Sequence, residues 1–210
     1  MSQMRLGVFG GMFDPVHHGH LRPALEVAEQ ARLDHVRLLP CAIPPHRDIP
    51  SATAEQRRDM LELAVADYDM FSVDSQELER SGTSYTIDTL ESLRAELPEA
   101  MLVLMLGEDA FAGLHRWHRW QEIFSLAQVV IMRRPGGTEE FDAAIDQELS
   151  ARRCPIADLP GKDRGAIAMA EVTPLQISST LIRHVVGRGE DPGFLVPEPV
   201  ARYLREKRIY

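Results

Sequence analysis

The sequence predicts an α/β protein with a doubly wound, Rossmann-like, mostly parallel sheet and helices on both faces. Apolar runs of five to seven residues recur along the chain, and each is followed by a segment with helical spacing. Parallel strands need crossover connections, and right-handed crossovers cover both faces once the strand order reverses. We expect strands near 4–10, 35–41, 71–77, 101–107, 128–134 and 166–172.

Helical segments are expected near 20–32, 53–67, 85–97, 118–126, 139–152, 179–187 and 198–207. Thr53 and Gln56 have the spacing of a capping box at the start of the second of these. In the third, Ile87, Leu90, Leu93 and Leu97 recur on one helical face. We predict a single domain, residues 1–210, with a peripheral helix and loop at 136–165 and a C-terminal helical part at 173–210.

Composition and charge exclude several classes of protein. The 210 residues are 44% hydrophobic and 26% charged, close to the average for soluble globular proteins. Lys plus Arg number 23 against 32 Asp plus Glu, a net charge of −9 that argues against a general nucleic-acid partner. The apolar run 101–106 is too short to cross a membrane. Cys41 and Cys154 are far apart with no motif around them, and no signal peptide is recognisable, so we expect free thiols and a cytoplasmic protein.

A phosphate-binding motif, residues 10–20, follows the first strand and leads directly into a helix. Glycines allow the backbone to approach an anion, and a helix N-terminus offers unpaired N–H groups and the positive end of its dipole. Two imidazoles three positions apart add further donors. The predicted phosphate-binding residues here are Gly10, Gly11, Met12, Phe13, His17 and His20.

Other interpretations of this first motif fit less well. Gly7, Gly10 and Gly11 lack the spacing of the dinucleotide-binding fingerprint, and no Lys follows as a P-loop requires. A zinc site would need the Glu of H-E-x-x-H or a Cys-x-x-Cys pair, and neither is present. A tight turn followed by a helix with capping histidines stays open as the purely structural alternative.

A second motif, residues 177–183, also comes just after a strand and begins a helix. Ser178 or Ser179 suits the N-cap, and the hydroxyls can bond either to the helix start or to phosphate oxygens. Arg183 lies one turn in, and its planar fork matches phosphate oxygens. An ordinary serine cap with a surface arginine is the structural alternative. The predicted phosphate-binding residues of the second motif are Ile177, Ser178, Ser179, Thr180 and Arg183.

Together the two motifs resemble the G-G-x-F-D-P-x-H-x-G-H and I-S-S-T-x-x-R signatures of the nucleotidyltransferase superfamily. The resemblance implies ATP as co-substrate, with His17 and His20 contacting the nucleotide phosphates and Ser179, Thr180 and Arg183 holding the triphosphate. We expect His17, His20 and Arg183 to be catalytic through in-line positioning and charge stabilisation, without a covalent intermediate. The polyphosphate implies Mg²⁺, and we predict no separate protein metal site.

Three internal segments bear on the acceptor. They contain Ser84-Tyr85-Thr86, Gly107-Glu108-Asp109 and the pair Trp117 and Trp120. Taken alone, the first suits a helix start, and each tryptophan suits either the core or stacking on a flat ring. As a set, they resemble the S-Y-T, G-x-D and W-x-x-W segments of the bacterial nicotinate-nucleotide adenylyltransferases.

That resemblance implies nicotinic acid mononucleotide as acceptor, and deamido-NAD and pyrophosphate as products. Thr86 and the backbone near Trp117 would recognise the pyridine carboxylate, Trp117 would stack on the ring, and Asp109 would bind a ribose hydroxyl. The acceptor-binding residues implied are His46, Arg47, Ser84, Tyr85, Thr86, Gly107, Asp109, Trp117 and Arg134, with His46, Arg47 and Arg134 serving phosphate groups. The chain departs from the family at Met12, where Thr is usual.

Alternative functions predict other observations. Phosphopantetheine adenylyltransferases share both motifs but not the S-Y-T and W-x-x-W set, and nicotinamide mononucleotide is a third acceptor for the same reaction. A non-catalytic nucleotide-binding regulator is expected to have lost a phosphate contact, whereas His17, His20 and Arg183 are present. A nicotinamide-dependent dehydrogenase would need the G-x-G-x-x-G turn.

Overall fold

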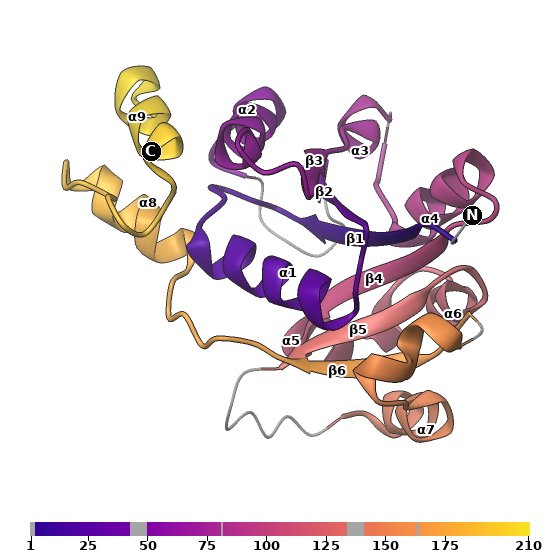
Figure 1. Ribbon diagram of the computed structural model, residues 1–210. Coiled ribbons are helices and arrows are strands. Elements are labelled where there is room, and N and C mark those ends of the chain that lie inside the picture. The colour runs from indigo at the N-terminus through magenta and orange to yellow at the C-terminus, as the bar shows by residue number, and fades with distance from the viewer. Residues whose placement is uncertain (1–2, 43–49, 81, 134–140, 163) are drawn as a thin grey trace. The chain divides into compact units, whose positions relative to one another are not determined.

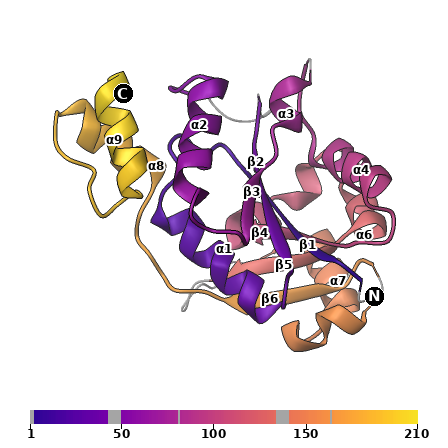
Figure 2. The same cartoon turned by 45° about the horizontal axis from the view of Figure 1, so that its top comes forward.

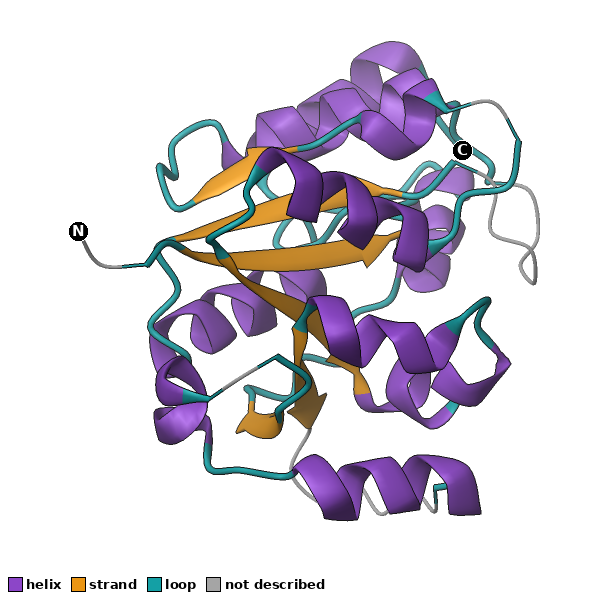
Figure 3. Ribbon diagram, turned by 90° about the vertical axis from the view of Figure 1, so that its right-hand side faces the viewer, coloured by secondary structure: helices purple, strands orange, loops and turns teal. Residues whose placement is uncertain are grey.

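The protein folds around a six-stranded parallel sheet with the strand order β3-β2-β1-β4-β5-β6. Figure 3 colours the strands and the helices separately. The computed structural model describes residues 3–42, 50–80, 82–133, 141–162 and 164–210. The strands are β1 (Arg5–Gly11), β2 (His35–Pro40), β3 (Phe71–Val73), β4 (Met101–Gly107), β5 (Gln128–Arg133) and β6 (Ile167–Glu171).

The strand order makes the sheet doubly wound. Neighbouring strands are numbered consecutively except at β1 and β4, where the order reverses, and β4 pairs in parallel with both β1 and β5. Right-handed crossovers on either side of this reversal direct their helices to opposite faces, and ligands of such sheets bind beyond the carboxyl ends of the strands. The predicted fold class is therefore confirmed.

Nine α-helices and three 3₁₀ turns connect the strands in the described part of the chain. The helices are α1 (His18–Gln30), α2 (Ala54–Val65), α3 (Gln76–Glu79), α4 (Thr86–Glu96), α5 (Glu108–Ala112), α6 (Ile123–Leu126), α7 (Ala143–Arg152), α8 (Ser179–Gly187) and α9 (Glu198–Lys207). The 3₁₀ turns are Leu114–Arg116, Trp120–Glu122 and Ile156–Gly161. Among the described residues, we find no helix with the length and apolarity needed to cross a membrane.

Local sequence signals explain two helices well. At the start of α2, Gln56 N donates to Thr53 Oγ1 at 3.2 Å, and Thr53 N donates to Gln56 Oε1 at 2.9 Å, which is the predicted capping box. In α4, Ile87, Leu90 and Leu93 are completely buried. The predicted apolar face of that helix therefore forms part of the core.

Two predicted elements are wrong in extent. The strand expected at 71–77 ends at Val73, because the chain turns at Asp74, whose carboxylate accepts from Gln76 N at 3.1 Å as α3 begins. The helix expected at 118–126 is broken: Arg119 has a φ of 51° in the left-handed region, and only a 3₁₀ turn and the short α6 follow. Helices α3 and α5 were not predicted. They are short and carry little hydrophobic periodicity.

The residue contacts group the chain into two compact units. The first unit contains Met1–Phe9, Pro23–Val36 and Tyr85–Thr173, and the second contains Gly10–Arg22, Arg37–Ser84 and Pro174–Tyr210. The single-domain organisation stays a prediction. Both phosphate-binding motifs belong to the second unit. Of the predicted acceptor-binding segments, G-x-D and W-x-x-W belong to the first unit, and S-Y-T begins at the last residue of a second-unit segment.

In the first unit, β4, β5 and β6 lie side by side (Figure 1). The strand residues are apolar and almost entirely buried, as expected for parallel strands covered on both faces. Gln128 is a buried polar exception, and its Nε2 donates to Leu159 O at 3.0 Å and to Lys162 O at 2.9 Å. These bonds fix the 3₁₀ turn Ile156–Gly161 against β5.

In the second unit, α9 packs against α2. Tyr203 of α9 donates from its hydroxyl to Asp59 Oδ2 of α2 at 2.8 Å. Helices α8 and α9 follow each other toward the C-terminal end of the chain (Figure 2). This packing attaches the segment that carries the second motif to the segment that follows β2.

Candidate functional site

The first motif holds two imidazole rings against each other at the start of α1. The centroids of His17 and His20 are 3.7 Å apart with an angle of 25° between the rings, and Phe13 presents its ring to His20 at 5.1 Å. His17 is only 3% exposed. Since α1 begins at His18, both rings lie at the N-terminal end of a 13-residue helix, where the dipole favours an anion.

The two glycines of the first motif meet different surroundings. A Cβ on Gly11 would lie 3.0 Å from the Phe13 ring, so the ring would have to shift to admit a side chain there. Among the described residues, the nearest atom to a Cβ on Gly10 would be Leu39 O at 4.0 Å. Gly10 is exposed, so its backbone can approach a ligand closely.

The second motif begins α8. Ser178 is the N-cap, and its hydroxyl accepts from Leu181 N at 3.2 Å. Of the two predicted cap candidates, Ser178 is therefore the one used. Ser179 donates from Oγ to the main-chain oxygen of Pro15 at 2.9 Å, and Pro15 belongs to the first motif.

Arg183 also joins the two motifs. Its Nη1 donates to Asp14 O at 2.7 Å, and its Nη2 donates to Thr180 Oγ1 at 3.2 Å. Gly19 allows the backbones to approach, because a Cβ there would lie 3.0 Å from Ile177 O and 3.0 Å from the His17 ring. These contacts bring residues separated by most of the chain together within the second unit.

Arg57 of α2 bonds to the main chain of the first motif. The sequence analysis did not identify this residue. It is 1% exposed, and its Nη1 donates to Met12 O at 2.9 Å and to Cys41 O at 2.7 Å. Burial lowers the pKa of the Arg57 guanidinium, and the Asp14 carboxylate acts in the opposite direction. In the sequence it stands next to Arg58 in an amphipathic helix, which is typical of a solvated position.

Ser84, a predicted acceptor-binding residue, is only 9% exposed, and its hydroxyl donates to Glu77 Oε2 at 2.7 Å. Glu77, on α3, is 6% exposed. Ser84 does not cap α4, whose N-cap is Tyr85 with no side-chain capping bond. The hydroxyl of Ser84 is engaged inside the protein, so the residue anchors the start of the S-Y-T segment.

The remaining acceptor candidates of the first unit lie near the ends of β4 and α4. Thr86 is the first residue of α4, and the Tyr85 ring lies 4.5 Å from the ring of His118. Gly107 ends β4, and a Cβ on it would lie 2.8 Å from Asp109 Oδ1. The Asp109 carboxylate therefore lies close over the carboxyl end of this strand.

The two tryptophans have different environments. Trp117 is half-buried and follows the 3₁₀ turn Leu114–Arg116, with its main-chain N–H donating to Leu114 O. Trp120 packs edge-on against Phe124, with ring centroids 6.2 Å apart, and Arg152 lies over the same phenylalanine at 4.8 Å. Trp120 thus serves internal packing, which leaves Trp117 as the better candidate for ligand stacking.

Three predicted phosphate contacts lie outside the described residues: His46, Arg47 and Arg134.

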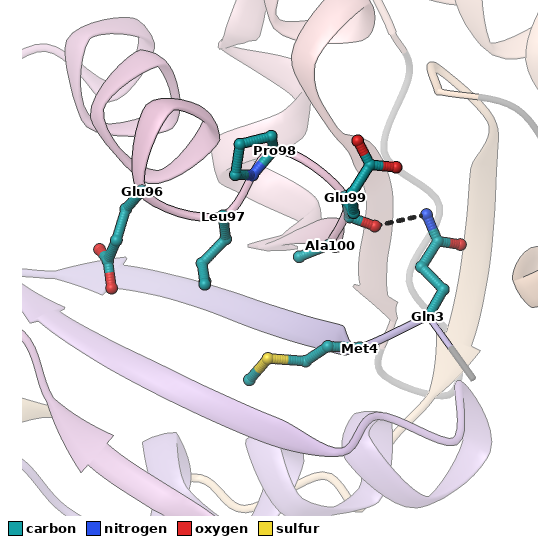
Figure 4. A pocket seen from close by; sticks show the side chains of 7 residues that line it. All are labelled: Gln3, Met4, Glu96, Leu97, Pro98, Glu99 and Ala100. Atoms are coloured by element: carbon teal, nitrogen blue, oxygen red, sulfur yellow. Dashed lines mark hydrogen bonds between the residues drawn. The ribbon is translucent and has the colours of Figure 1, made fainter. Parts of the chain in front are cut away.

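A pocket occurs in the first unit, at the amino ends of β1 and β4 (Figure 4). It is lined by Gln3, Met4, Glu96, Leu97, Pro98, Glu99 and Ala100, and Gln3 Nε2 donates to Glu99 O at 2.8 Å. None of its residues belongs to a predicted motif, and ligands of doubly wound sheets bind beyond the opposite, carboxyl ends of the strands.

The class of protein follows from comparison with known families. The model of the cytidylyltransferase-like family matches residues 8–185, a span that includes both phosphate-binding motifs. The chain also superposes on a solved structure, Plasmodium falciparum nicotinic acid mononucleotide adenylyltransferase complexed with NaAD. The TM-score is 0.72 at 14% identity, covering 99% of this chain and 98% of that one, and at this identity the likeness concerns the fold.

Curated relatives are similar over nearly the full chain. A relative in Cellvibrio japonicus, named Probable nicotinate-nucleotide adenylyltransferase, is 46% identical over 206 residues, which cover 98% of each chain. A relative of the same name in Pseudomonas aeruginosa is 44% identical over 207 residues, covering 98% of this chain and 97% of the relative. The chain therefore belongs to the cytidylyltransferase-like family and, within it, to the nicotinate-nucleotide adenylyltransferases.

Proposed function

We propose that the protein transfers the adenylyl group of ATP to nicotinic acid mononucleotide, giving deamido-NAD and pyrophosphate in NAD biosynthesis. The contact between the two motifs carries this proposal. Ser179 and Arg183 bond to the main chain of the first motif, so the two motifs lie against each other within the second unit. A triphosphate needs donors of this kind arranged around one anion. Membership of the family supports the choice of acceptor.

The reaction we propose is a direct displacement. An oxygen of the acceptor phosphate attacks the α-phosphorus of ATP, a new P–O bond forms, and the bond from the α-phosphorus to the bridging oxygen breaks as pyrophosphate leaves. No covalent enzyme intermediate is needed, because catalysis of this type rests on alignment and charge stabilisation. We assign His17 and His20 to the nucleotide phosphates, and Ser179, Thr180 and Arg183 to the triphosphate.

Recognition of the acceptor's pyridine and ribose is assigned to the first unit. We propose that Thr86 and the backbone near Trp117 recognise the pyridine carboxylate, that the Trp117 ring stacks on the pyridine, and that Asp109 binds a ribose hydroxyl. The half-buried state of Trp117 supports this, since a partly exposed indole offers a flat apolar surface. His46, Arg47 and Arg134 stay predicted phosphate contacts.

Mg²⁺ is proposed to enter with ATP, because phosphate oxygens and water supply most ligands of this ion in nucleotide sites. In the first motif, the carboxylate of Asp14 is already engaged by Ser51 N at 2.8 Å, Ala52 N at 3.0 Å and the Tyr210 hydroxyl at 2.6 Å. We therefore assign no metal ligand to it. We propose the cytoplasm as the compartment, as the sequence predicts.

The test is pyrophosphate release from ATP and Mg²⁺ with three acceptors supplied in parallel: nicotinic acid mononucleotide, nicotinamide mononucleotide and phosphopantetheine. We expect kcat/KM to be highest for nicotinic acid mononucleotide, and the His20→Ala variant to serve as the low-activity control. Equal or better turnover of another acceptor would contradict the proposed substrate. ATP binding without turnover of any acceptor would favour a regulator instead.

A further inference from the structure

Asp14 is the single carboxylate of the first motif, and its side chain accepts several hydrogen bonds. Its side chain is almost fully buried, and it accepts from the main-chain N–H groups of Ser51 and Ala52 at 2.8 and 3.0 Å. The hydroxyl of Tyr210 donates to its Oδ1 at 2.6 Å. Three segments of the second unit thus meet at a single carboxylate.

The carboxylate also lies near Arg183, because this arginine donates to the main-chain oxygen of Asp14. The main-chain oxygen of Asp14 accepts from Arg183 Nη1 at 2.7 Å, whereas the carboxylate oxygen Oδ2 is 3.8 Å from the same nitrogen. The guanidinium therefore bonds to the peptide and only approaches the carboxylate. A carboxylate that loses one of its donors attracts the nearby guanidinium more strongly, because buried charges need partners.

We propose that Tyr210 is a positioning residue of the triphosphate site. It acts through Asp14, because its hydroxyl bonds to the carboxylate and so leaves the guanidinium of Arg183 directed to the anion. The inference rests on the proposed function. Burial and the bond to Asp14 raise the pKa of the Tyr210 phenol, so it remains a donor. Tyr210 is not offered as a catalytic residue, since its hydroxyl is committed to Asp14.

Tyr203 provides a matched control. Its hydroxyl donates to Asp59 Oδ2 at 2.8 Å in the same unit, so Tyr203→Phe deletes the same kind of bond between the helices α9 and α2. For Tyr210→Phe we expect ATP affinity, measured by calorimetry without acceptor, to fall about fivefold to tenfold, the size of one ordinary hydrogen bond. Tyr203→Phe is expected to leave ATP affinity unchanged, while it lowers the thermal midpoint of unfolding about as much as Tyr210→Phe does.

A double-mutant cycle tests whether Tyr210 acts through Asp14. In the Asp14→Asn background, the Tyr210→Phe change is expected to have little further effect on ATP affinity. The inference is overturned if Tyr210→Phe and Tyr203→Phe bind ATP equally well, or if Tyr210→Phe weakens ATP binding as much in the Asp14→Asn background as in the wild-type protein. Failure of the proposed function would be recognised by the absence of turnover with any acceptor. The binding measurements test the role of Tyr210 separately, because they need no turnover.

Discussion

Arg183 donates a 2.7 Å hydrogen bond to the main-chain oxygen of Asp14, which precedes it by 169 positions. The same guanidinium bonds to Thr180 one turn earlier in α8. A guanidinium has five N–H donors in a planar fork, so these two bonds leave further donors for an anion. The contact that fixes the second motif against the first is therefore compatible with phosphate binding by the same side chain.

Replacement of Arg183 by lysine is expected to lower kcat/KM about tenfold to a hundredfold, because an ammonium group lacks the fork that bonds to Asp14 and phosphate together. The measurement is steady-state pyrophosphate release. Arg188→Lys, at the other end of α8, is the control, since Arg188 is exposed and bonds to Glu190 Oε2 at 2.7 Å. Equal losses in the two variants would mean that Arg183 has no special role.

His20→Ala and Trp117→Ala are expected to affect different kinetic parameters. Loss of the imidazole should lower kcat far more than it raises KM, because its contact is proposed to stabilise charge that develops during transfer. Loss of the indole should mainly raise KM for nicotinic acid mononucleotide. Full kinetics with each substrate varied in turn will distinguish them, and the reversed pattern would show that the two assignments are exchanged.

The two glycines of the first motif are expected to respond differently to alanine. Gly11→Ala should lower the free energy of unfolding by about 1–3 kcal/mol, because the new Cβ would press on the Phe13 ring, which is 1% exposed and has little room to shift. Gly10→Ala should leave stability nearly unchanged and weaken ATP binding, since its Cβ would occupy the space beside the exposed backbone. Thermal unfolding and ATP titration of both variants check this. A stable Gly11→Ala protein would contradict the packing argument.

Arg57 is expected to be a determinant of stability. Arg57→Met should lower the free energy of unfolding by about 2–4 kcal/mol, because the main-chain oxygens of Met12 and Cys41 lose the bonds donated by the buried guanidinium. Arg58→Met changes the adjacent, half-exposed arginine, which pairs with Asp59 at 3.0 Å, and should cost no more than about 1 kcal/mol. Denaturant unfolding of both variants decides, and equal effects would refute the role given to Arg57.

Much of the fold could be predicted because it depends on local patterns. The apolar runs at Met101–Gly107 and Gln128–Arg133 predict buried parallel strands, and both are present. The break at Arg119 could not be predicted, since one of the two carboxylates that hold its guanidinium, Glu91, lies 28 positions away. Its guanidinium bonds to Glu91 Oε1 at 2.6 Å and to Glu122 Oε2 at 2.7 Å.

In the candidate site, the motif residues could be identified from the sequence. The residues that hold the motifs in place through hydrogen bonds could not. His17, His20 and Arg183 stand out because their residue types and spacing suit phosphate chemistry. Arg57 and Tyr210 act through bonds to Met12 and Asp14 that span 45 and 196 positions, and nothing in their own neighbourhoods indicates those partners. Ser84 was identified, but its bond to Glu77 is also invisible in the sequence.

The central claim is that both motifs bind one triphosphate, and calorimetric titration with ATP and with adenosine tests it most directly. His17→Ala in the first motif and Arg183→Ala in the second are each expected to weaken ATP binding about tenfold or more while leaving adenosine binding unchanged. Wild-type ATP affinity in either variant, or an equal loss for adenosine, would contradict the claim.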